Sequence, residues 1–317
     1  KRGGELVAWD DVTDVGLDPQ DVWAARMVEM TYFDKLKVYD RVPRSEVKRT
    51  GGKLIGVRWV DINKGDATDR NYRSRLVGRE FNVGKDDSLY ASTPPLEALR
   101  VVVSHAATDT PSGDRREIVV CDVRLAYFYA KINRDVFIEL PEEDPASGGD
   151  TVGKLRLCLY GTRGAAKSWQ ETLSRHLETI GFKQGRGHPS VFHHPQRGIK
   201  ALVHGDDYVA SGDRSELDWF NAELKKAYEI QSQNVGISKG TAREGKVLNR
   251  ILRCSEAGFE IEADPRHAEL VIEQMQIQEE RSVATPGVSG LEEDDKEDDE
   301  ELQGEFIREY RGIAARL

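Results

Sequence analysis

Two short apolar runs around a Gly-Asp pair are the feature that most constrains this chain. Residues Ala201–Ala210 read Ala-Leu-Val-His-Gly-Asp-Asp-Tyr-Val-Ala, and Gly-Asp favours a tight two-residue β-hairpin turn. We expect the tip of this hairpin to present the adjacent carboxylates of Asp206 and Asp207. Because side chains alternate between the faces of a strand, one would reach a site directly and the other would lie behind or beside it. The pair suits a hard cation such as Mg²⁺; an Asp-rich turn without chemistry is the alternative.

A third acid ends an apolar strand. Residues Ile118–Cys121 are apolar, and Asp122 follows them directly. A charge delivered by a buried-type strand needs a partner. If this strand and the hairpin share a sheet, their carboxylates could hold two metal ions between them. Two-metal sites activate an attacking oxygen and stabilise a leaving oxygen in phosphoryl or nucleotidyl transfer.

The net charge of −10 is distributed unevenly. Residues Glu292–Glu301 hold nine acids and one Lys, which is typical of a solvated, disordered loop or spacer. By contrast, the stretch from Arg41 to Arg79 is rich in Lys and Arg. Such a one-sided distribution permits a phosphate-binding face on an acidic protein, although an ordinary charged surface is the alternative.

The chain shows no apolar run of transmembrane length and no signal-peptide pattern. The opening residues Lys1–Gly4 look like an internal cut from a longer protein. The three Cys residues match neither a zinc pair nor a disulfide framework, so reduced, intracellular thiols are expected; they are Cys121, Cys158 and Cys254. The histidines at His193, His194 and His204 lack partners at metal-ligand spacing and are expected on the surface or in the hairpin.

The remaining patterns give a mixed order of strands and helices. A helical pattern through Val22 and Phe33 suggests no chemistry. The other expected helices begin at Leu96, run from Gly164 to Gly181, and begin at Asp213, where Glu216 completes a capping box. The expected strands are Lys53–Asp61, Tyr72–Phe81, Val136–Leu140 and Lys154–Tyr160, with a hairpin at Lys246–Glu262. This order predicts an α+β core in which an antiparallel sheet carries its acids on one side and helices on the other.

Several segments, in order, resemble the reverse transcriptase of copia-type LTR retrotransposon Pol polyproteins, from about Arg44 to Leu317. The segments that carry the resemblance are Tyr72–Phe81 (YRSRLVGREF), Cys121–Phe128 (CDVRLAYF), Val136–Pro141 (VFIELP), Leu159–Trp169 (LYGTRGAAKSW), Gly181-Phe182, Pro189–Phe192 (PSVF), Val203–Asp207 (VHGDD), Arg266–Leu270 (RHAEL), Thr285-Pro286 and Tyr310-Arg311.

The resemblance implies a right-hand polymerase fold: a palm with an antiparallel sheet backed by helices, a fingers β-hairpin and a partial thumb. The expected division is an N-terminal extension at residues 1–45, fingers at 46–97 and 130–163, palm with a primer-grip-like hairpin at 98–129 and 164–262, and thumb or connection at 263–317 with an acidic disordered loop at 290–304.

By the same resemblance, Asp122, Asp206 and Asp207 are the catalytic, metal-binding triad, with Asp122 and Asp206 as principal ligands and Asp207 as support. The cofactor would be two Mg²⁺ ions, with Mn²⁺ as an alternative. Arg73 and Arg75 share a face of their expected strand and would contact the incoming triphosphate, because a guanidinium fork matches phosphate oxygens. A solvated strand face is the alternative for both arginines.

The other implied residues surround the incoming nucleotide and the primer. The backbone amides of Leu125 and Ala126 would cradle phosphates, and the ring of Tyr127 would exclude a ribose 2′-hydroxyl. The remaining residues are Tyr160, Gly161 and Arg163 in the nucleotide pocket, Leu248, Asn249, Arg250 and Ile251 in the primer grip, and the Asp264–Gln278 helix along the duplex. Plain core aromatics are the alternative for Tyr127 and Tyr160.

The sequence departs from the family pattern at three positions. His204 stands where an aromatic residue is usual, Gly205 replaces a residue with a side chain, and Ala166 stands where Pro is usual. The expected function is an RNA-directed DNA polymerase, a nucleotidyltransferase, that extends a primer 3′-hydroxyl with deoxynucleotides. A catalytically silent, transposon-derived nucleic-acid-binding protein is the alternative, and another palm-fold enzyme such as a nucleotide cyclase is a weaker one.

The expected partners are an RNA or DNA template with its primer and dNTPs, without a membrane. RNase H and integrase parts of the same polyprotein are expected outside this chain. The expected location is intracellular and cytoplasmic, in a virus-like particle, with a possible nuclear step.

Overall fold

The computed structural model describes residues 7–66, 68–81, 84, 89, 91–110, 113–248, 250–263, 266–278 and 303–314. The chain divides into two compact units, residues 1–245 with 254–259, and residues 246–253 with 260–317. Of the expected acidic loop at 290–304, residues 290–302 lie outside the described part, as does Asn249 of the expected primer grip. The expected fingers, palm and thumb boundaries stay predictions.

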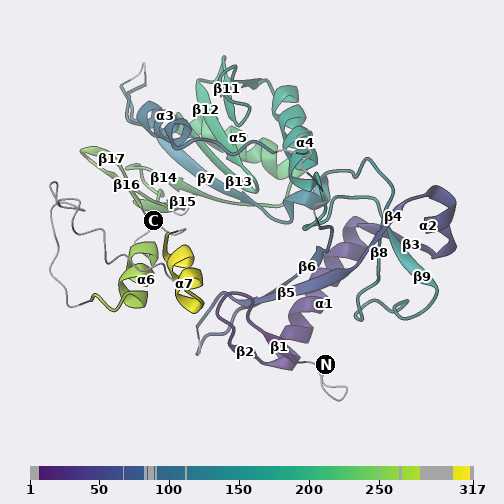
Figure 1. Ribbon diagram of the computed structural model, residues 1–317. Coiled ribbons are helices and arrows are strands. Elements are labelled where there is room, and N and C mark those ends of the chain that lie inside the picture. The colour runs from purple at the N-terminus through teal and green to yellow at the C-terminus, as the bar shows by residue number, and fades with distance from the viewer. Residues whose placement is uncertain are drawn as a thin grey trace, which may run out of the picture. The chain divides into compact units, whose positions relative to one another are not determined.

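The first unit contains a six-stranded sheet, which lies in the upper part of Figure 1. All its neighbouring strands pair antiparallel, in the order β10 (Lys183–Gln184), β11 (Val191–His194), β12 (Ile199–His204), β13 (Asp207–Gly212), β7 (Glu117–Val123) and β14 (Ile230–Val235). The helices of this region are α3 (Leu96–Ala106), α4 (Ala165–Thr179) and α5 (Arg214–Ala227). The α+β class with an antiparallel sheet, expected from the sequence, is therefore confirmed.

The two faces of this sheet differ. Tyr208 and Ala210 pack into one apolar cluster with the buried stripes of α4 and α5, which include Trp169 and Phe220. The opposite face carries Asp122, and there Ser211 contacts His105 of α3, with 2.8 Å between the hydroxyl and Nδ1. The expectation that every helix lies opposite the acids is thus wrong for α3. That helix covers the far end of the acidic face and leaves the end with Asp122 exposed.

The basic hairpin forms a two-stranded sheet of its own. Strands β5 (Val57–Asn63) and β6 (Tyr72–Gly78) pair antiparallel. A separate four-stranded sheet has the order β3 (Tyr39–Pro43), β9 (Thr151–Leu155), β8 (Val136–Ile138) and β4 (Lys53–Ile55), in which β4 and β8 run parallel. A short helix, α2 (Ser45–Thr50), lies between β3 and β4 in sequence.

The bounds of two strands expected from the sequence are wrong in this region. The expected Lys53–Asp61 strand is broken at Gly56 into β4 and β5, which belong to different sheets. The expected Lys154–Tyr160 strand begins earlier and ends at Leu155. From there the chain turns inward, because Leu159 and Tyr160 are buried with Leu76 and Phe128 in a second apolar cluster.

An N-terminal helix, α1 (Pro19–Leu36), packs against β6. Asp18 caps it by accepting from the backbone N–H groups of Gln20 and Asp21, and Pro19 occupies the first turn, where its missing N–H costs nothing. A small hairpin of β1 (Ala8–Trp9) and β2 (Gly16–Leu17) precedes it.

Two local expectations also change. Asp213 stands at the N-cap of α5 as expected, but its side chain makes no capping hydrogen bond; it lies 3.7 Å from Arg116 instead. His194 is buried rather than on the surface, and its Nε2 lies 3.1 Å from the Ile180 carbonyl oxygen.

A three-stranded sheet consists of β15 (Glu244–Val247), β16 (Arg250–Ser255) and β17 (Gly258–Ala263). The expected strand from Lys246 to Arg253 is therefore two strands. The chain turns between them at Leu248, whose φ is +46°. The second unit also holds α6 (Arg266–Gln274) and α7 (Glu305–Ala314). Among the described residues, no helix combines the length and apolar character needed to span a membrane.

Candidate nucleotidyl-transfer site

The expected hairpin at Ala201–Ala210 forms, with Gly205 and Asp206 as its two-residue turn. Gly205 has φ +58°, which a type II′ turn requires at its first central position and which only glycine adopts without strain. Two hydrogen bonds hold the tip: the Trp169 Nε1–H donates to the Gly205 carbonyl and the Val123 N–H to the Asp206 carbonyl, both at 2.8 Å. The carboxylates therefore project from an anchored turn.

Asp122 lies beside this tip. Asp207 is the direct register partner of Asp122 across β13 and β7, so both side chains project from the same face of the sheet. Asp206 lies in the turn rather than in the strand, so the strict strand alternation expected for the hairpin does not apply to it.

Burial and mutual repulsion perturb these acids. Burial, together with the charges of Asp122 and Asp207, raises the pKa of Asp206 to about 6, although Arg75 and Tyr160 act in the opposite direction. Burial and then Asp122 raise the pKa of Asp207 as well. Carboxyls that are crowded together resist ionisation.

A cavity of about 570 Å³ joins two of these acids to the basic hairpin. Its lining includes Asp122, Asp206, Arg73, Arg75 and Leu125. Both arginines are exposed on the same face of β6, and neither has a carboxylate within salt-bridge distance among the described residues. The sequence-predicted triphosphate ligands and two of the three acids thus share one cavity. Residues of the expected pocket outside its lining are Ala126, Tyr127, Tyr160, Gly161 and Arg163.

Tyr160 nevertheless connects the cavity to the acids. Its hydroxyl donates to Asp206 Oδ2 at 3.3 Å, and the Arg75 guanidinium lies 4.2 Å from the centre of its ring. The ring of Tyr127 lies 4.4 Å away, centre to centre. Burial and the neighbouring Asp206 raise the pKa of Tyr160, so its hydroxyl stays protonated and can donate.

Close backbone packing joins the turn after Tyr160 to β6. The Gly78 N–H donates to the Tyr160 carbonyl at 2.7 Å. A Cβ on Gly161 would lie 2.2 Å from the Gly78 carbonyl oxygen, and the φ of Gly161 is +77°, so only glycine fits there. Arg163 contributes its backbone N–H, which donates to Glu80 at 2.8 Å. Its expected place in the nucleotide pocket stays a prediction.

The chain turns sharply at Leu125, whose φ is +54°, and enters the 3₁₀ helix η2 (Ala126–Tyr129). Among the described residues, neither the Leu125 nor the Ala126 backbone N–H has a protein acceptor. A pair of free N–H groups at a turn suits an anion. This geometry agrees with the expected phosphate contacts of the two amides without testing them.

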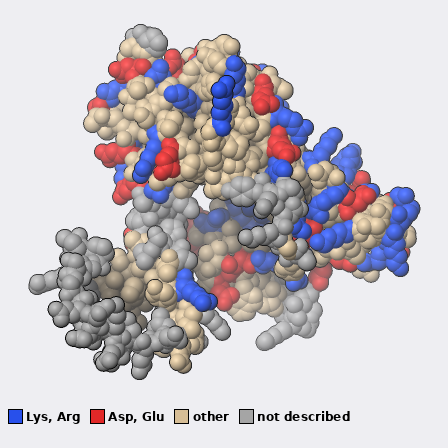
Figure 2. Space-filling model, turned by 45° about the horizontal axis from the view of Figure 1, so that its top comes forward, with Lys and Arg blue, Asp and Glu red and all other residues tan. Residues whose placement is uncertain are grey.

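Ion pairs neutralise much of the basic stretch. Figure 2 shows Lys and Arg gathered over α2 and its neighbouring strands, with acids among them. The residues of this stretch that form ion pairs are Arg41, Arg44, Arg49, Lys53, Arg58 and Arg70. The basic charge inferred from the sequence is therefore partly used within the fold, which leaves Arg73 and Arg75 directed at the cavity.

The expected primer grip and thumb belong to another part of the chain. Leu248, Arg250 and Ile251 lie in the second unit, at the turn between β15 and β16 and in β16 itself. The expected Asp264–Gln278 helix is observed as α6, with Asp264 and Pro265 outside the described residues.

The acids offer oxygen ligands, which Mg²⁺ prefers, so the donor set fits a hard divalent cation in its chemistry. Such a cation would offset the repulsion that raises the pKa values of Asp206 and Asp207. Among the described residues, no group of three or more His, Cys, Asp or Glu side chains is already spaced to hold an ion.

Sequence reasoning missed one residue of the cavity wall. Glu29 of α1 lines the cavity and is buried. In the sequence, the one indication of its burial is its position on the buried side of the helix, seven residues after Val22 and four before Phe33.

Residues 37–240 match the sequence family described as "Reverse transcriptase (RNA-dependent DNA polymerase)". Two curated relatives from Arabidopsis thaliana are the retrovirus-related Pol polyproteins from transposons RE1 and RE2. The first is 29% identical over 52% of this chain and 11% of its own length, and the second is 27% identical over 59% and 13%. The chain thus spans about a tenth of the length of these relatives. The expected resemblance to a copia-type retrotransposon reverse transcriptase is confirmed.

Two solved structures show a distant likeness. One is apo telomerase from Candida tropicalis truncated from its C-terminal domain, at 9% identity and a TM-score of 0.40 over 80% of this chain and 63% of that one. The other is telomerase from Candida albicans in complex with a fragment of telomeric RNA, at 8% identity and a TM-score of 0.41 over 80% and 51%. Neither likeness is close enough to assign a fold. The α+β architecture itself agrees with the right-hand arrangement that the family resemblance implies.

Proposed function

The chain belongs to the reverse transcriptase (RNA-dependent DNA polymerase) family, and on that premise we propose that it is the polymerase part of a copia-type retrotransposon Pol polyprotein. The reaction joins the 3′-oxygen of a primer to the α-phosphorus of a dNTP and releases pyrophosphate. The observation that carries this proposal is that Asp122 and Asp206 share a cavity with Arg73 and Arg75. Acids and guanidiniums facing one cavity are what nucleotidyl transfer on a triphosphate needs.

Reverse transcriptases generally use divalent metal ions, and we propose two Mg²⁺ ions here, with Mn²⁺ as a substitute. Asp122 and Asp206 would be the principal ligands, and Asp207 would support them. Bound metal would supply charge neutralisation at the attacking and leaving oxygens. Asp206 and Asp207 are held at an anchored turn, which Trp169 fixes by donating to the Gly205 carbonyl.

The chain's other residues would bind and orient the nucleotide. Arg73 and Arg75 project from β6 toward the cavity, where their guanidiniums would contact the triphosphate. The free backbone N–H groups of Leu125 and Ala126 would contribute phosphate contacts. Tyr127, whose ring lies 4.4 Å from that of Tyr160, would stand where a ribose 2′-hydroxyl is excluded.

A polymerase of this family acts on a nucleic-acid template and dNTPs. Because phosphate contacts dominate such affinities, template-primer binding is expected to weaken steeply with salt. The finer partners are proposals: a primed RNA or DNA strand, no membrane, and RNase H and integrase parts of the same polyprotein outside this chain. A cytoplasmic virus-like particle, with a nuclear step, is the proposed location.

Primer extension on an RNA template with Mg²⁺ tests the proposal. Asp122→Asn and Asp206→Asn are each expected to lower the rate of dNTP incorporation about 10³-fold or more, because charge stabilisation in the transition state is lost. Asp213→Asn is the matched control, since Asp213 is half exposed beside Arg116, and it is expected to retain wild-type incorporation.

The alternative is a catalytically silent nucleic-acid-binding protein. His204, which lies beside the turn, favours this alternative. Its Nδ1 is buried and has no hydrogen-bond partner among the described residues. If the wild-type chain within its full polyprotein binds template-primer but incorporates no dNTP, the alternative stands and the polymerase proposal fails.

A further inference from the structure

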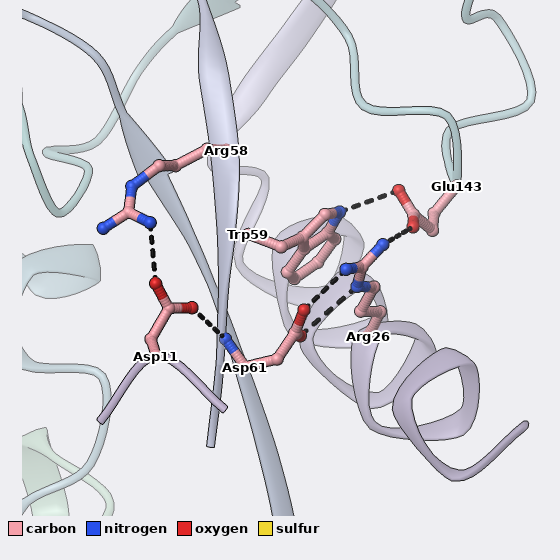
Figure 3. A network of polar contacts seen from close by, with 6 residues as sticks. All are labelled: Asp11, Arg26, Arg58, Trp59, Asp61 and Glu143. Carbon is pink, nitrogen blue, oxygen red and sulfur yellow. Dashed lines mark hydrogen bonds and ion pairs between the residues drawn. The ribbon is translucent and has the colours of Figure 1, made fainter. Parts of the chain in front are cut away.

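Helix α1 precedes the family-matched span of residues 37–240, yet it forms part of the cavity wall. A buried network holds it in place (Figure 3). Arg26 donates to Asp61 of β5 at 2.5 Å and to Glu143 at 3.1 Å, and the Trp59 Nε1–H donates to the same Glu143 at 2.9 Å. The side chains of Arg26, Asp61 and Glu143 are 11%, 6% and 2% exposed. A fully paired buried network of this kind fixes the helix against the hairpin that carries Arg75.

One turn further along α1, Glu29 faces the cavity from this fixed position. The residue is 7% exposed, and its Oε1 has no hydrogen-bond partner among the described residues. The cavity it lines also holds Arg73, Arg75 and Asp206. A buried carboxyl oxygen without a partner costs stability, so its presence at a cavity of this kind calls for a role.

The charged groups around Glu29 are mainly cationic. Arg75 of β6 and, more weakly, Arg124 of the turn after β7 attract its carboxylate, and the Leu76 backbone N–H faces it. The other charged side chains that line the cavity are Lys64, Arg73, Asp122 and Asp206. Burial outweighs these attractions and raises the pKa of Glu29 to about 7. Both charge states of Glu29 are therefore accessible near neutral pH.

We propose that Glu29 sets the affinity of the cavity for the triphosphate of an incoming nucleotide through the guanidinium of Arg75. As a carboxylate, Glu29 is the counter-charge of Arg75 and repels the phosphates. As a neutral acid, it leaves Arg75 to the phosphates, so triphosphate binding takes up a proton from solvent at Glu29. Tyr160 still supports Arg75 when Glu29 is neutral, because the guanidinium lies on its ring. The assignment of the triphosphate to this cavity rests on the proposed function.

The test is isothermal titration calorimetry of a deoxynucleoside triphosphate with Mg²⁺ into the whole chain. It is run from pH 6 to pH 8 in two buffers of different ionisation enthalpy, which gives the protons taken up. The wild type is expected to take up about half a proton per nucleotide near pH 7 beyond that of Glu29→Gln. Its affinity should fall about fivefold more than that of Glu29→Gln between pH 6 and pH 8, if triphosphate binding raises the pKa of Glu29 by one unit from about 7.

Asp34→Asn is the matched control, because Asp34 lies on the same helix, exposed and paired with Arg41. It is expected to keep the wild-type proton uptake. Subtracting the proton uptake of Glu29→Gln from that of the wild type removes the protons taken up by Asp206 and by the nucleotide's own phosphate. Equal proton uptake and equal pH dependence in the wild type and Glu29→Gln would overturn the inference. A chain that shows the linkage but does not extend primers would keep the inference and overturn the proposed function instead.

Discussion

Asp207 lies directly opposite Asp122 in the antiparallel pair of β13 and β7. Two like charges at directly paired positions destabilise a sheet, because their side chains share a face and stand close together. The two strands nonetheless keep this pair. The Trp169 Nε1–H anchors the adjacent turn by donating to the Gly205 carbonyl. Repelling carboxylates on a rigid support fit the divalent cation proposed for this site.

The first prediction concerns the cost of that pair without metal. Asp207→Asn is expected to raise the free energy of unfolding of the metal-free chain by about 1 kcal/mol at pH 8, because it removes one of the two opposed charges. Thermal unfolding with chelator and then with excess Mg²⁺ measures this. Mg²⁺ should stabilise the wild type more than the variant, since ligand binding to the folded state adds stability. A variant that is less stable than the wild type in chelator would contradict the repulsion.

The hydroxyl of Tyr160 has a separate effect on the acids. It donates to Asp206 and thereby lowers the pKa of that carboxyl against the effect of burial. Tyr160→Phe is expected to raise the pKa of Asp206 above its value of about 6, as measured by carboxyl ¹³C NMR titration of the metal-free protein. Tyr127→Phe is the control, because the hydroxyl of Tyr127 makes no such bond. An unchanged or lower pKa of Asp206 in Tyr160→Phe would show that the hydroxyl does not act on it.

Glu80 joins three segments of the chain that are far apart in sequence. It accepts from Lys53 and Arg134 and from the Arg163 backbone N–H, and its side chain is 1% exposed. Burial opposes its ionisation, but these donors lower the pKa of Glu80 to about 2.

Glu80→Gln is therefore expected to lower the free energy of unfolding at pH 7 by about 2 to 3 kcal/mol, because Arg134 and Lys53 lose the negative charge that both contact. Chemical denaturation measures this loss. Glu171→Gln is the control, since Glu171 is an exposed partner of Lys167 on α4, and it should keep the wild-type midpoint. Equal midpoints for both variants would mean that the network adds no stability.

Local patterns predicted the turn but not its pairing. Gly205-Asp206 has turn chemistry that depends on two residues alone, and the turn forms where expected. The register that sets Asp207 against Asp122 joins segments far apart in the chain. A one-residue slip would have placed the two side chains on opposite faces, and no local pattern decides between these registers.

The errors have the same origin. The apolar run from Lys53 to Asp61 reads as one strand, yet Gly56 lets the chain pass from one sheet to another. Glu29 looks like an ordinary helical acid, because its burial comes from β6, which packs against α1. Features that depend on which surfaces meet were missed, whereas the helix expected from Gly164 to Gly181 follows from local spacing and forms as α4.

Tyr208 provides a prediction about the core. It is fully buried, and its hydroxyl has no hydrogen-bond partner among the described residues. Tyr208→Phe keeps the ring and removes the unsatisfied hydroxyl, so it is expected to raise the free energy of unfolding by about 1 kcal/mol. Tyr39→Phe is the contrasting variant, because the Tyr39 hydroxyl donates to Asp144 at 2.5 Å, and it should be destabilising. Denaturant titration of both variants gives the two signs, and a destabilised Tyr208→Phe would reveal a partner for that hydroxyl.

The last prediction concerns the pH dependence of stability at Glu29. Its pKa in the folded chain, about 7, lies above its ordinary value of 4.5. The folded state therefore binds this proton more tightly than the unfolded state, and the stability that this proton contributes is lost as pH rises through 7. Glu29→Gln stays neutral throughout. The free energy of unfolding of Glu29→Gln minus that of the wild type should therefore increase by about 2 to 3 kcal/mol between pH 5 and pH 8.

The difference between the two proteins is the quantity to measure, because His105 works against the trend in each protein alone. Burial lowers the pKa of His105 to about 4, so its contribution to stability grows as pH rises. Urea unfolding of both proteins at matched pH values cancels this contribution. A difference that stays constant from pH 5 to pH 8 would show that Glu29 does not change its charge in the folded chain, and the proton linkage proposed for triphosphate binding would fail with it.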